Sequence, residues 1–278
     1  MRGRLTAIKN IAWALAIVLC LLAVFVGLLF SAFTRSAEEQ VRGGVVLGAE
    51  PEVKVEEAAA PARDPQVIDG NLSVLAETED AGQSYIDSLT FLVDSTLIGL
   101  RDYDILSGGT ETDQVWATPS GTLAVMDMDE SLIVFPNDGS FVTAANAAMV
   151  LQPDILVISV GNDGEAGVGM YEFIDQYELL ISSIRKTSPN TWIVCLPLTS
   201  ITQTYSSSDG VTVELCVEAN KWIQQACQDT GAVYADCISL LTDSNGYLLQ
   251  EYASANGKTL NSTGLNQILQ YLRYHAVT

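Results

Sequence analysis

The sequence predicts a three-layer α/β/α sandwich with a parallel sheet, preceded by one N-terminal transmembrane helix. From about residue 85 onward, short apolar runs alternate with segments of helical periodicity. Near-continuous apolar runs are typical of parallel strands, because helices cover both faces of such a sheet. One long segment without charged residues lies near the N-terminus and has the length of a membrane span.

Four apolar runs are the expected strands of the sheet. Asp94 and Ser95 follow the first run, and Asn162 lies just after the second. In parallel α/β sheets, ligands bind beyond the carboxyl ends of the strands, so these polar residues are expected at the binding edge. The runs are residues 89–93, 155–160, 192–196 and 233–235.

Three segments between and after these strands place apolar residues at helical spacing. The last helix is expected to begin with Ser262 as its N-cap. Right-handed crossovers through such helices build the parallel sheet. The expected inward faces are Phe173, Tyr177, Leu180, Ile181 and Ile184; then Leu215, Ala219, Ile223 and Ala226; then Leu265, Ile268, Leu269 and Leu272.

Residues 11–33 form the expected membrane span. At about 1.5 Å per residue this segment covers roughly 34 Å, enough to cross the hydrocarbon core. Arg2, Arg4 and Lys9 precede it. The positive-inside rule then places residues 1–10 in the cytoplasm and the rest of the chain outside, as a single-pass membrane protein.

A cleaved signal peptide is the competing interpretation of the same segment. The apolar region of a signal peptide is about 7–15 residues long and ends at small residues. Residues 11–33 are longer, and Phe30 is bulky where a small residue is needed. The sequence therefore favours an uncleaved signal anchor.

Residues 34–84 are rich in Ala, Glu, Pro and Gly and lack apolar periodicity. Such a composition cannot bury a core, and its like charges extend the chain. This segment is expected to be a disordered linker that carries one domain, residues 85–278, away from the membrane.

The charge balance excludes nucleic acid as a partner. The chain has 34 acidic and 13 basic residues, a formal charge of -21, whereas nucleic-acid binding requires a basic face. No His or Cys cluster suggests zinc, and the acidic runs at 127–130 and 243–246 lack the spacing of a calcium loop. No metal or cofactor is therefore expected, and the sequence identifies no protein partner.

Four cysteines lie in the part of the chain expected outside the cytoplasm, where disulfides can form. They are interpreted as small buried apolar residues. A bridge between Cys195 and Cys237 remains an alternative, because sequence does not fix connectivity. The four are Cys195, Cys216, Cys227 and Cys237.

Ser95 and Asn162 are the candidate reactive residues. Ser95 stands at a strand-to-helix turn, where a hydroxyl can act as a nucleophile beside backbone N–H groups, although it can equally cap the helix. Asn162 can donate its amide to a developing oxyanion, although Asn-Asp-Gly also favours a turn.

These residues, together with the segment before the last helix, resemble the SGNH/GDSL hydrolase family (GDSL-like lipase/acylhydrolase) over about residues 85–278. The resemblance implies an SGNH-hydrolase or flavodoxin-like fold and esterase or O-deacetylase activity. It implies a small acyl ester, or an O-acetylated glycan of the cell envelope, as ligand. The similar segments are residues 91–99, 119–122, 160–163 and 256–260.

In this resemblance Ser95 stands at the nucleophile position, and Gly121 and Asn162 stand at the oxyanion positions. Asn256 and Thr259 stand where the family has its catalytic Asp and His. A serine hydroxyl is a poor nucleophile without a base in hydrogen-bond reach. The sequence therefore predicts an impaired or non-catalytic protein that binds a ligand or a partner.

Two further departures concern glycines of the family. Val93 and Val160 replace them and add bulk near the expected oxyanion site. His275 is the only histidine, and its place about 20 Å along the last helix excludes contact with Ser95 unless that helix is broken.

Two alternatives remain open from the sequence. The protein can be an active ester hydrolase that uses Ser95 with an unconventional base, either Lys258 or Asp236. A lysine base requires burial that removes its proton. It can also be a structural module of the cell envelope, an interpretation that a cleft filled by Val93 and Val160 would favour.

Overall fold

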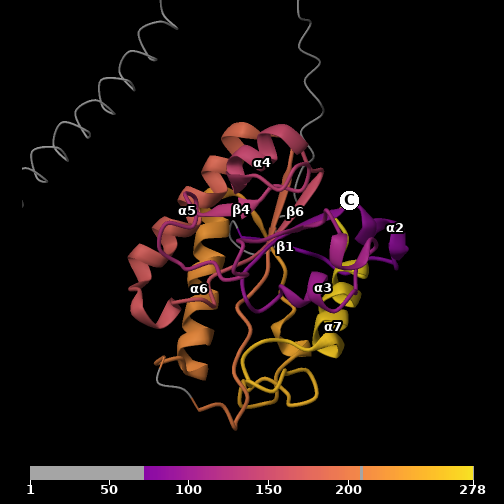
Figure 1. Cartoon of the computed structure of the whole chain (residues 1–278). Helices are drawn as coiled ribbons and strands as arrows, with labels where there is room; N and C mark the ends of the chain where they lie inside the picture. The colour runs from indigo at the N-terminus through magenta and orange to yellow at the C-terminus, as the bar shows by residue number, and fades with distance from the viewer. Residues whose placement is uncertain (1–71, 207–208, 278) are drawn as a thin grey trace, which may run out of the picture. The chain divides into compact units, whose positions relative to one another are not determined.

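The computed structural model describes residues 72–206 and 209–277, and Figure 1 shows how their helices and strands are arranged. A six-stranded sheet has the order β1-β8-β7-β6-β2-β3, and every neighbouring pair is parallel. The predicted parallel sheet is confirmed. Its strands are β1 (Ser73–Val74), β2 (Leu89–Val93), β3 (Val115–Trp116), β6 (Ile155–Ser159), β7 (Trp192–Cys195) and β8 (Val233–Tyr234).

Helices cover both faces of this sheet (Figure 1). Leu92 and Ile158 point into one core with α4, α5 and α6, whereas Phe91 and Val157 point into a second core with α2, α3 and α7. Alternation along each strand therefore builds the predicted three layers. The helices are α2 (Gly82–Asp87), α3 (Gly99–Asp102), α4 (Ala144–Leu151), α5 (Met170–Thr187), α6 (Val213–Thr230) and α7 (Ser262–Arg273).

Short elements complete the described domain. An antiparallel hairpin of β4 (Leu132–Val134) and β5 (Phe141–Thr143) precedes α4. Three 3₁₀ turns lie in the loops: η1 (Gly109–Glu111), η2 (Glu165–Gly167) and η3 (Ile238–Leu240).

The predicted helix faces are confirmed for α5 and α7 and adjusted for α6. All five expected apolar residues of α5 are buried, as are the four of α7. On α6, Leu215 is only half-buried, while Cys216 and Asn220 are buried. The N-cap of α7 is Asn261 and not Ser262, because the Asn261 side chain accepts the N–H groups of the first turn.

The folded domain begins before the predicted boundary at residue 85. Strand β1 lies within the segment expected to be a linker, yet Ser73 and Val74 pair with Val233 and Tyr234. A two-residue edge strand is too short to leave an apolar pattern in the sequence. The predicted span 11–33 lies outside the described residues, and among residues 72–206 and 209–277 no helix is long and apolar enough to cross a membrane.

Two sets of buried side chains answer questions that the sequence left open. All four cysteines of the described domain are free and buried, so the alternative bridge between Cys195 and Cys237 is absent. Val93 and Val160 pack into the cores on opposite faces of the sheet. They therefore do not fill a cleft at Ser95, and the observation that would favour a purely structural module is not found.

The register of β2 and β6 brings the two reactive segments together. Val93 pairs with Ser159, so Asp94 and Ser95 leave the sheet beside the segment that carries Asn162. Gly161, directly before Asn162, has φ +117°, and a Cβ there would lie 3.1 Å from side-chain atoms of Leu198 and Phe173. Only glycine fits this turn without strain.

Candidate active site

The Asp163 carboxylate holds Ser95. The Ser95 hydroxyl donates to Asp163 Oδ1 at 2.6 Å, and the Ser95 N–H donates to Oδ2 at 3.1 Å. The Leu123 N–H donates to the same Oδ2 at 2.9 Å. One carboxylate therefore joins the loops after β2, β3 and β6 at the carboxyl edge of the sheet.

A second carboxylate, Asp94, lies beneath this contact. It is fully buried, and it accepts the N–H groups of Thr96 at 3.0 Å and Asn162 at 2.8 Å. Burial, followed by the nearby charge of Asp163, raises the pKa of Asp94 to about 7. The charge of Asp163 thus opposes the ionisation of Asp94, while the hydrogen bonds of both side chains fix the loops.

The Asn162 side chain has unused hydrogen-bonding capacity. It is fully buried, and neither its amide nitrogen nor its amide oxygen has a partner in the described part of the protein. An unsatisfied buried polar group costs about 1–3 kcal/mol, so such a group requires an explanation. The Asn162 amide thus keeps both its donor and its acceptor unused within the described residues.

Gly121 differs from the expectation for an oxyanion donor. Its N–H donates to the Thr118 carbonyl at 3.0 Å, within a turn in which Gly121 has φ +75°. This N–H is therefore already bonded, whereas the Asn162 amide has no hydrogen bond among the described residues.

Asn256 and Thr259 bond to each other. The Asn256 side-chain oxygen accepts the N–H groups of Lys258 and Thr259, both at 3.0 Å, and the Thr259 hydroxyl at 3.1 Å. Within the described residues, neither side chain has a hydrogen bond to Ser95. The segment that resembles the family's acid–base loop is thus a closed turn that offers Ser95 no proton acceptor.

Lys258, in the same loop, forms an ion pair. Its amino group lies 3.1 Å from the buried carboxylate of Glu165 and 3.7 Å from Asp209. Burial lowers the pKa of Lys258, but the charge and hydrogen bond of Glu165 outweigh burial and raise it overall. A protonated ammonium cannot accept the Ser95 proton, so this geometry does not favour Lys258 as a base.

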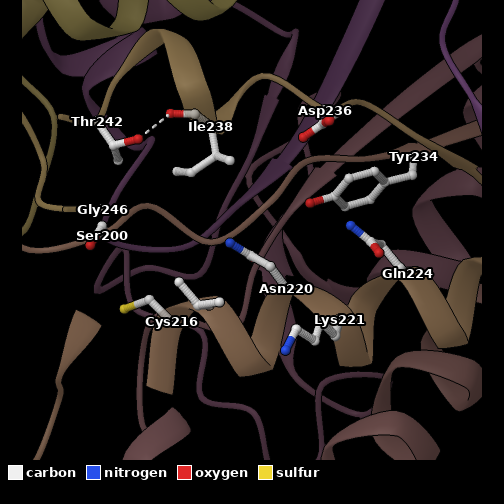
Figure 2. A pocket seen from close by; sticks show the side chains of 11 residues that line it. Ser200, Cys216, Asn220, Lys221, Gln224, Tyr234, Asp236, Ile238, Thr242 and Gly246 are labelled. Atoms are coloured by element: carbon white, nitrogen blue, oxygen red, sulfur yellow. Dashed lines mark hydrogen bonds between the residues drawn. The ribbon is translucent and has the colours of Figure 1, made fainter. Parts of the chain in front are cut away.

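Asp236, the other suggested base, lines a separate cavity of about 320 Å³ (Figure 2). Figure 2 shows Asp236 toward the same end of this cavity as Tyr234 and Gln224. The lining residues include neither Ser95 nor Asn162 nor Asp163. They are Ser200, Cys216, Val217, Asn220, Lys221, Gln224, Tyr234, Asp236, Ile238, Thr242 and Gly246.

His275 follows the end of α7. Its ring stacks on Tyr271 with centroids 3.8 Å apart, and its Nδ1 lies 2.9 Å from the Tyr271 carbonyl oxygen. Among residues 72–206 and 209–277 it has no contact with Ser95, and no group of His, Cys, Asp or Glu there could hold a metal ion.

Asp163 is the residue of this site that reasoning from the sequence missed. The sequence Asn-Asp-Gly marks Asp163 as part of a turn and gives no direct sign that its carboxylate bonds Ser95. A signal was present, because Ser95 and Asp163 both follow the ends of apolar runs expected at the same edge of the sheet. Strand adjacency was needed to turn that signal into a contact.

Substitution of two buried asparagines tests whether the Asn162 side chain contributes hydrogen bonds to stability. Asn162→Leu removes no side-chain hydrogen bond, so we expect the free energy of unfolding to change by less than about 1 kcal/mol. Asn220→Leu is the matched control, because Asn220 bonds both the N–H and the carbonyl of Leu198. This control should lose about 2–4 kcal/mol in urea unfolding. Equal losses would show that Asn162 is bonded within the protein.

The raised pKa of Asp94 predicts how stability depends on pH. The folded state binds the Asp94 proton more tightly than the unfolded state, whose pKa is about 3.9. The contribution of Asp94 to stability is therefore greatest below about pH 4 and falls as pH rises toward 7. Relative to Asp94→Asn, the unsubstituted protein should lose on the order of 2–4 kcal/mol over this range.

The control for this titration is Glu130→Gln, which neutralises an exposed carboxylate. Its stability relative to the unsubstituted protein should change little between pH 4 and pH 7 in urea unfolding. A flat difference between the unsubstituted protein and Asp94→Asn would contradict the assignment of a raised pKa to Asp94.

Comparison with known proteins finds one family whose sequence model matches part of the chain. Residues 134–261 match the sequence model of the GDSL-like Lipase/Acylhydrolase family. This stretch contains Asn162, Asp163, Asn256 and Thr259, whereas Ser95 precedes it. No curated protein matches the sequence.

Solved structures with a similar fold share little sequence with this chain. A protein described as a lipolytic protein of the G-D-S-L family from Desulfitobacterium hafniense DCB-2 is 13% identical, with a TM-score of 0.48, over 68% of this chain and 99% of the other. A GDSL-like lipase from Parabacteroides merdae ATCC 43184 is 14% identical, with a TM-score of 0.48, over 73% and 98%. The acetylxylan esterase Axe2 from Geobacillus stearothermophilus is 14% identical, with a TM-score of 0.40, over 68% and 94%. Over residues 134–261, the parallel α/β domain of this chain is therefore similar to the GDSL-like lipase/acylhydrolase family.

Proposed function

We propose that this protein is a membrane-anchored, extracytoplasmic member of the GDSL-like lipase/acylhydrolase family that binds an acyl ester at Ser95 and hydrolyses it only slowly. The uncharged segment 11–33, with Arg2, Arg4 and Lys9 before it, supports the anchor and its orientation. Small acyl esters and O-acetyl groups on envelope glycans are the ligand class that the family match supports.

The unpartnered amide of Asn162 is the observation that carries ester binding. The backbone N–H of Asn162 donates to the Asp94 carboxylate, and the adjacent Asp163 accepts the hydroxyl of Ser95. The amide is therefore held at the same sheet edge as the hydroxyl, buried and without a partner in the described residues. A carbonyl oxygen bound there would satisfy the amide and present its carbon to Ser95.

Slow turnover follows from the residues that stand at the acid and base positions. Thr259 has no group that can take a proton at neutral pH, and Asn256 has no imidazole to orient. In serine proteases, loss of triad members leaves roughly 10³–10⁴-fold acceleration over water from the oxyanion hole and binding. A comparable remnant is expected here.

Restoring the missing pair tests this account. The double substitution Asn256→Asp and Thr259→His should raise kcat/KM for p-nitrophenyl acetate by about 10²-fold or more, the usual contribution of a positioned general base. Ser95→Ala in the same background should abolish the gain. Asn256→Asp alone is the control and should change little, because it adds no imidazole.

The same assay has two results that would contradict the proposal of slow hydrolysis. Turnover by the unsubstituted protein at ordinary enzymatic rates, lost in Ser95→Ala, would refute the slow-enzyme proposal. A folded double variant that remains as slow as the unsubstituted protein would also count against it, because the loop would then not face Ser95. O-acetylated glycans serve as the second substrate.

A further inference from the structure

We propose that Asp163 accepts the hydroxyl proton of Ser95 when the domain hydrolyses an ester, so that Ser95 and Asp163 act as a serine–carboxylate pair. This inference rests on the proposed function, because it names the group that drives the slow reaction. It replaces Lys258 and Asp236 as the unconventional base.

The contact between the two side chains has the geometry that a general base requires. The distance from Ser95 Oγ to Asp163 Oδ1 is 2.6 Å, within the range of about 2.6–3.2 Å for proton abstraction. In the described residues this is the one hydrogen bond of the Ser95 hydroxyl. The proton therefore already points at the atom that would receive it.

The rest of the Asp163 residue is held in place by the backbone. Oδ2 accepts the N–H groups of Ser95 and Leu123, and the Asp163 carbonyl accepts the Val125 N–H at 3.1 Å. These bonds leave Oδ1 for the hydroxyl and fix its direction. The pair is thus preorganised, which lowers the entropy cost of the reaction.

Acidic side chains lie close to Asp163. Asp94 is buried beside it, and the two carboxylates repel each other. Glu165 adds a third acidic group nearby, although Lys258 pairs with Glu165. The contact between Ser95 and Asp163 therefore lies among acidic groups.

The acylation step balances without a further reactant. Ser95 Oγ forms a bond to the ester carbonyl carbon while its proton moves to Asp163 Oδ1, and the negative charge moves to the carbonyl oxygen beside the Asn162 amide. The intermediate then collapses, the bond to the alcohol oxygen breaks, and Asp163 returns the proton to that oxygen. The products are the alcohol and acyl-Ser95.

Deacylation repeats the same proton transfers with water. A water molecule attacks the acyl carbon and gives its proton to Asp163. The bond to Ser95 Oγ then breaks, and Asp163 returns the proton to Ser95. The carboxylic acid leaves, and both side chains regain their starting state.

Two versions of the purified full-length chain distinguish whether Asp163 acts as a base or only positions Ser95. Asp163→Asn keeps an oxygen that can accept the backbone N–H groups but removes the base. In the otherwise unsubstituted chain it should lower Ser95-dependent hydrolysis of p-nitrophenyl acetate by about 10²-fold or more. In the background of Asn256→Asp and Thr259→His, where an imidazole supplies the base, it should cost less than about fivefold.

Asp236→Asn is the matched control, because it makes the same acid-to-amide change in the wall of the separate cavity; it should leave hydrolysis unchanged. Similar losses from Asp163→Asn in both backgrounds would overturn the proposal in favour of a positioning role. Activity of the variant that combines Asn256→Asp, Thr259→His and Asp163→Asn also demonstrates that a protein with Asp163→Asn folds. Should it not fold, Asp163→Glu is the second variant, and a folded Asp163→Glu protein no faster than Ser95→Ala would overturn the role of Asp163.

The outcomes also separate this inference from the proposed function. If the unsubstituted chain has no Ser95-dependent turnover but the restored background is active, the ester site exists and Asp163 is not its base. If neither is active and neither binds an acyl ester, the proposed function itself fails.

Discussion

The hydrogen bonds of the Asp163 carboxylate are the interaction on which the site depends. Its two oxygens accept three donors from Ser95 and Leu123, and its backbone is bonded to Val125. The loops after β2, β3 and β6 are therefore tied together at the carboxyl edge of the sheet. Asp94 adds a second tie between the first and third of these loops. These two carboxylates, one buried and one half-buried, thus hold together segments that are far apart in the sequence.

This arrangement separates two functions of a hydrolase site that are usually present together. We propose that the Asn162 amide binds a carbonyl group, because it is buried and has no partner in the described residues. In that part of the chain, Asn256 and Thr259 offer Ser95 no proton acceptor, since the Thr259 N–H and hydroxyl donate to the Asn256 side-chain oxygen. The ion pair between Lys258 and Glu165 adds a further contact to that loop. Binding of an ester is therefore better supported than its rapid hydrolysis.

The sequence predicted the sheet, the layers and most helix faces because these depend on periodicity. The runs at 89–93 and 155–160 became β2 and β6, and the α5 stripe from Phe173 to Ile184 is buried as expected. Strand β1 was missed because two residues carry no period, and Asn261 was missed as the cap of α7 because the adjacent Ser262 is also a favoured cap residue. The positions of Ser95 and Asn162 followed from motifs. The hydrogen bond from Ser95 to Asp163 did not, because it depends on strand order and on side-chain rotamers, and neither is written in local sequence.

Within the described residues, the Ser95 hydroxyl has the Asp163 carboxylate, and no other group, as its proton acceptor. A crystal structure of the protein at near-atomic resolution tests it most directly, because the Ser95 and Asp163 side chains would then be seen individually. The account predicts Asp163 Oδ1 within hydrogen-bond distance of Ser95 Oγ, as in the 2.6 Å contact described above, with Thr259 turned toward Asn256. Electron density that places Ser95 Oγ against Lys258, or that turns the Asp163 carboxylate away from it, would contradict the account.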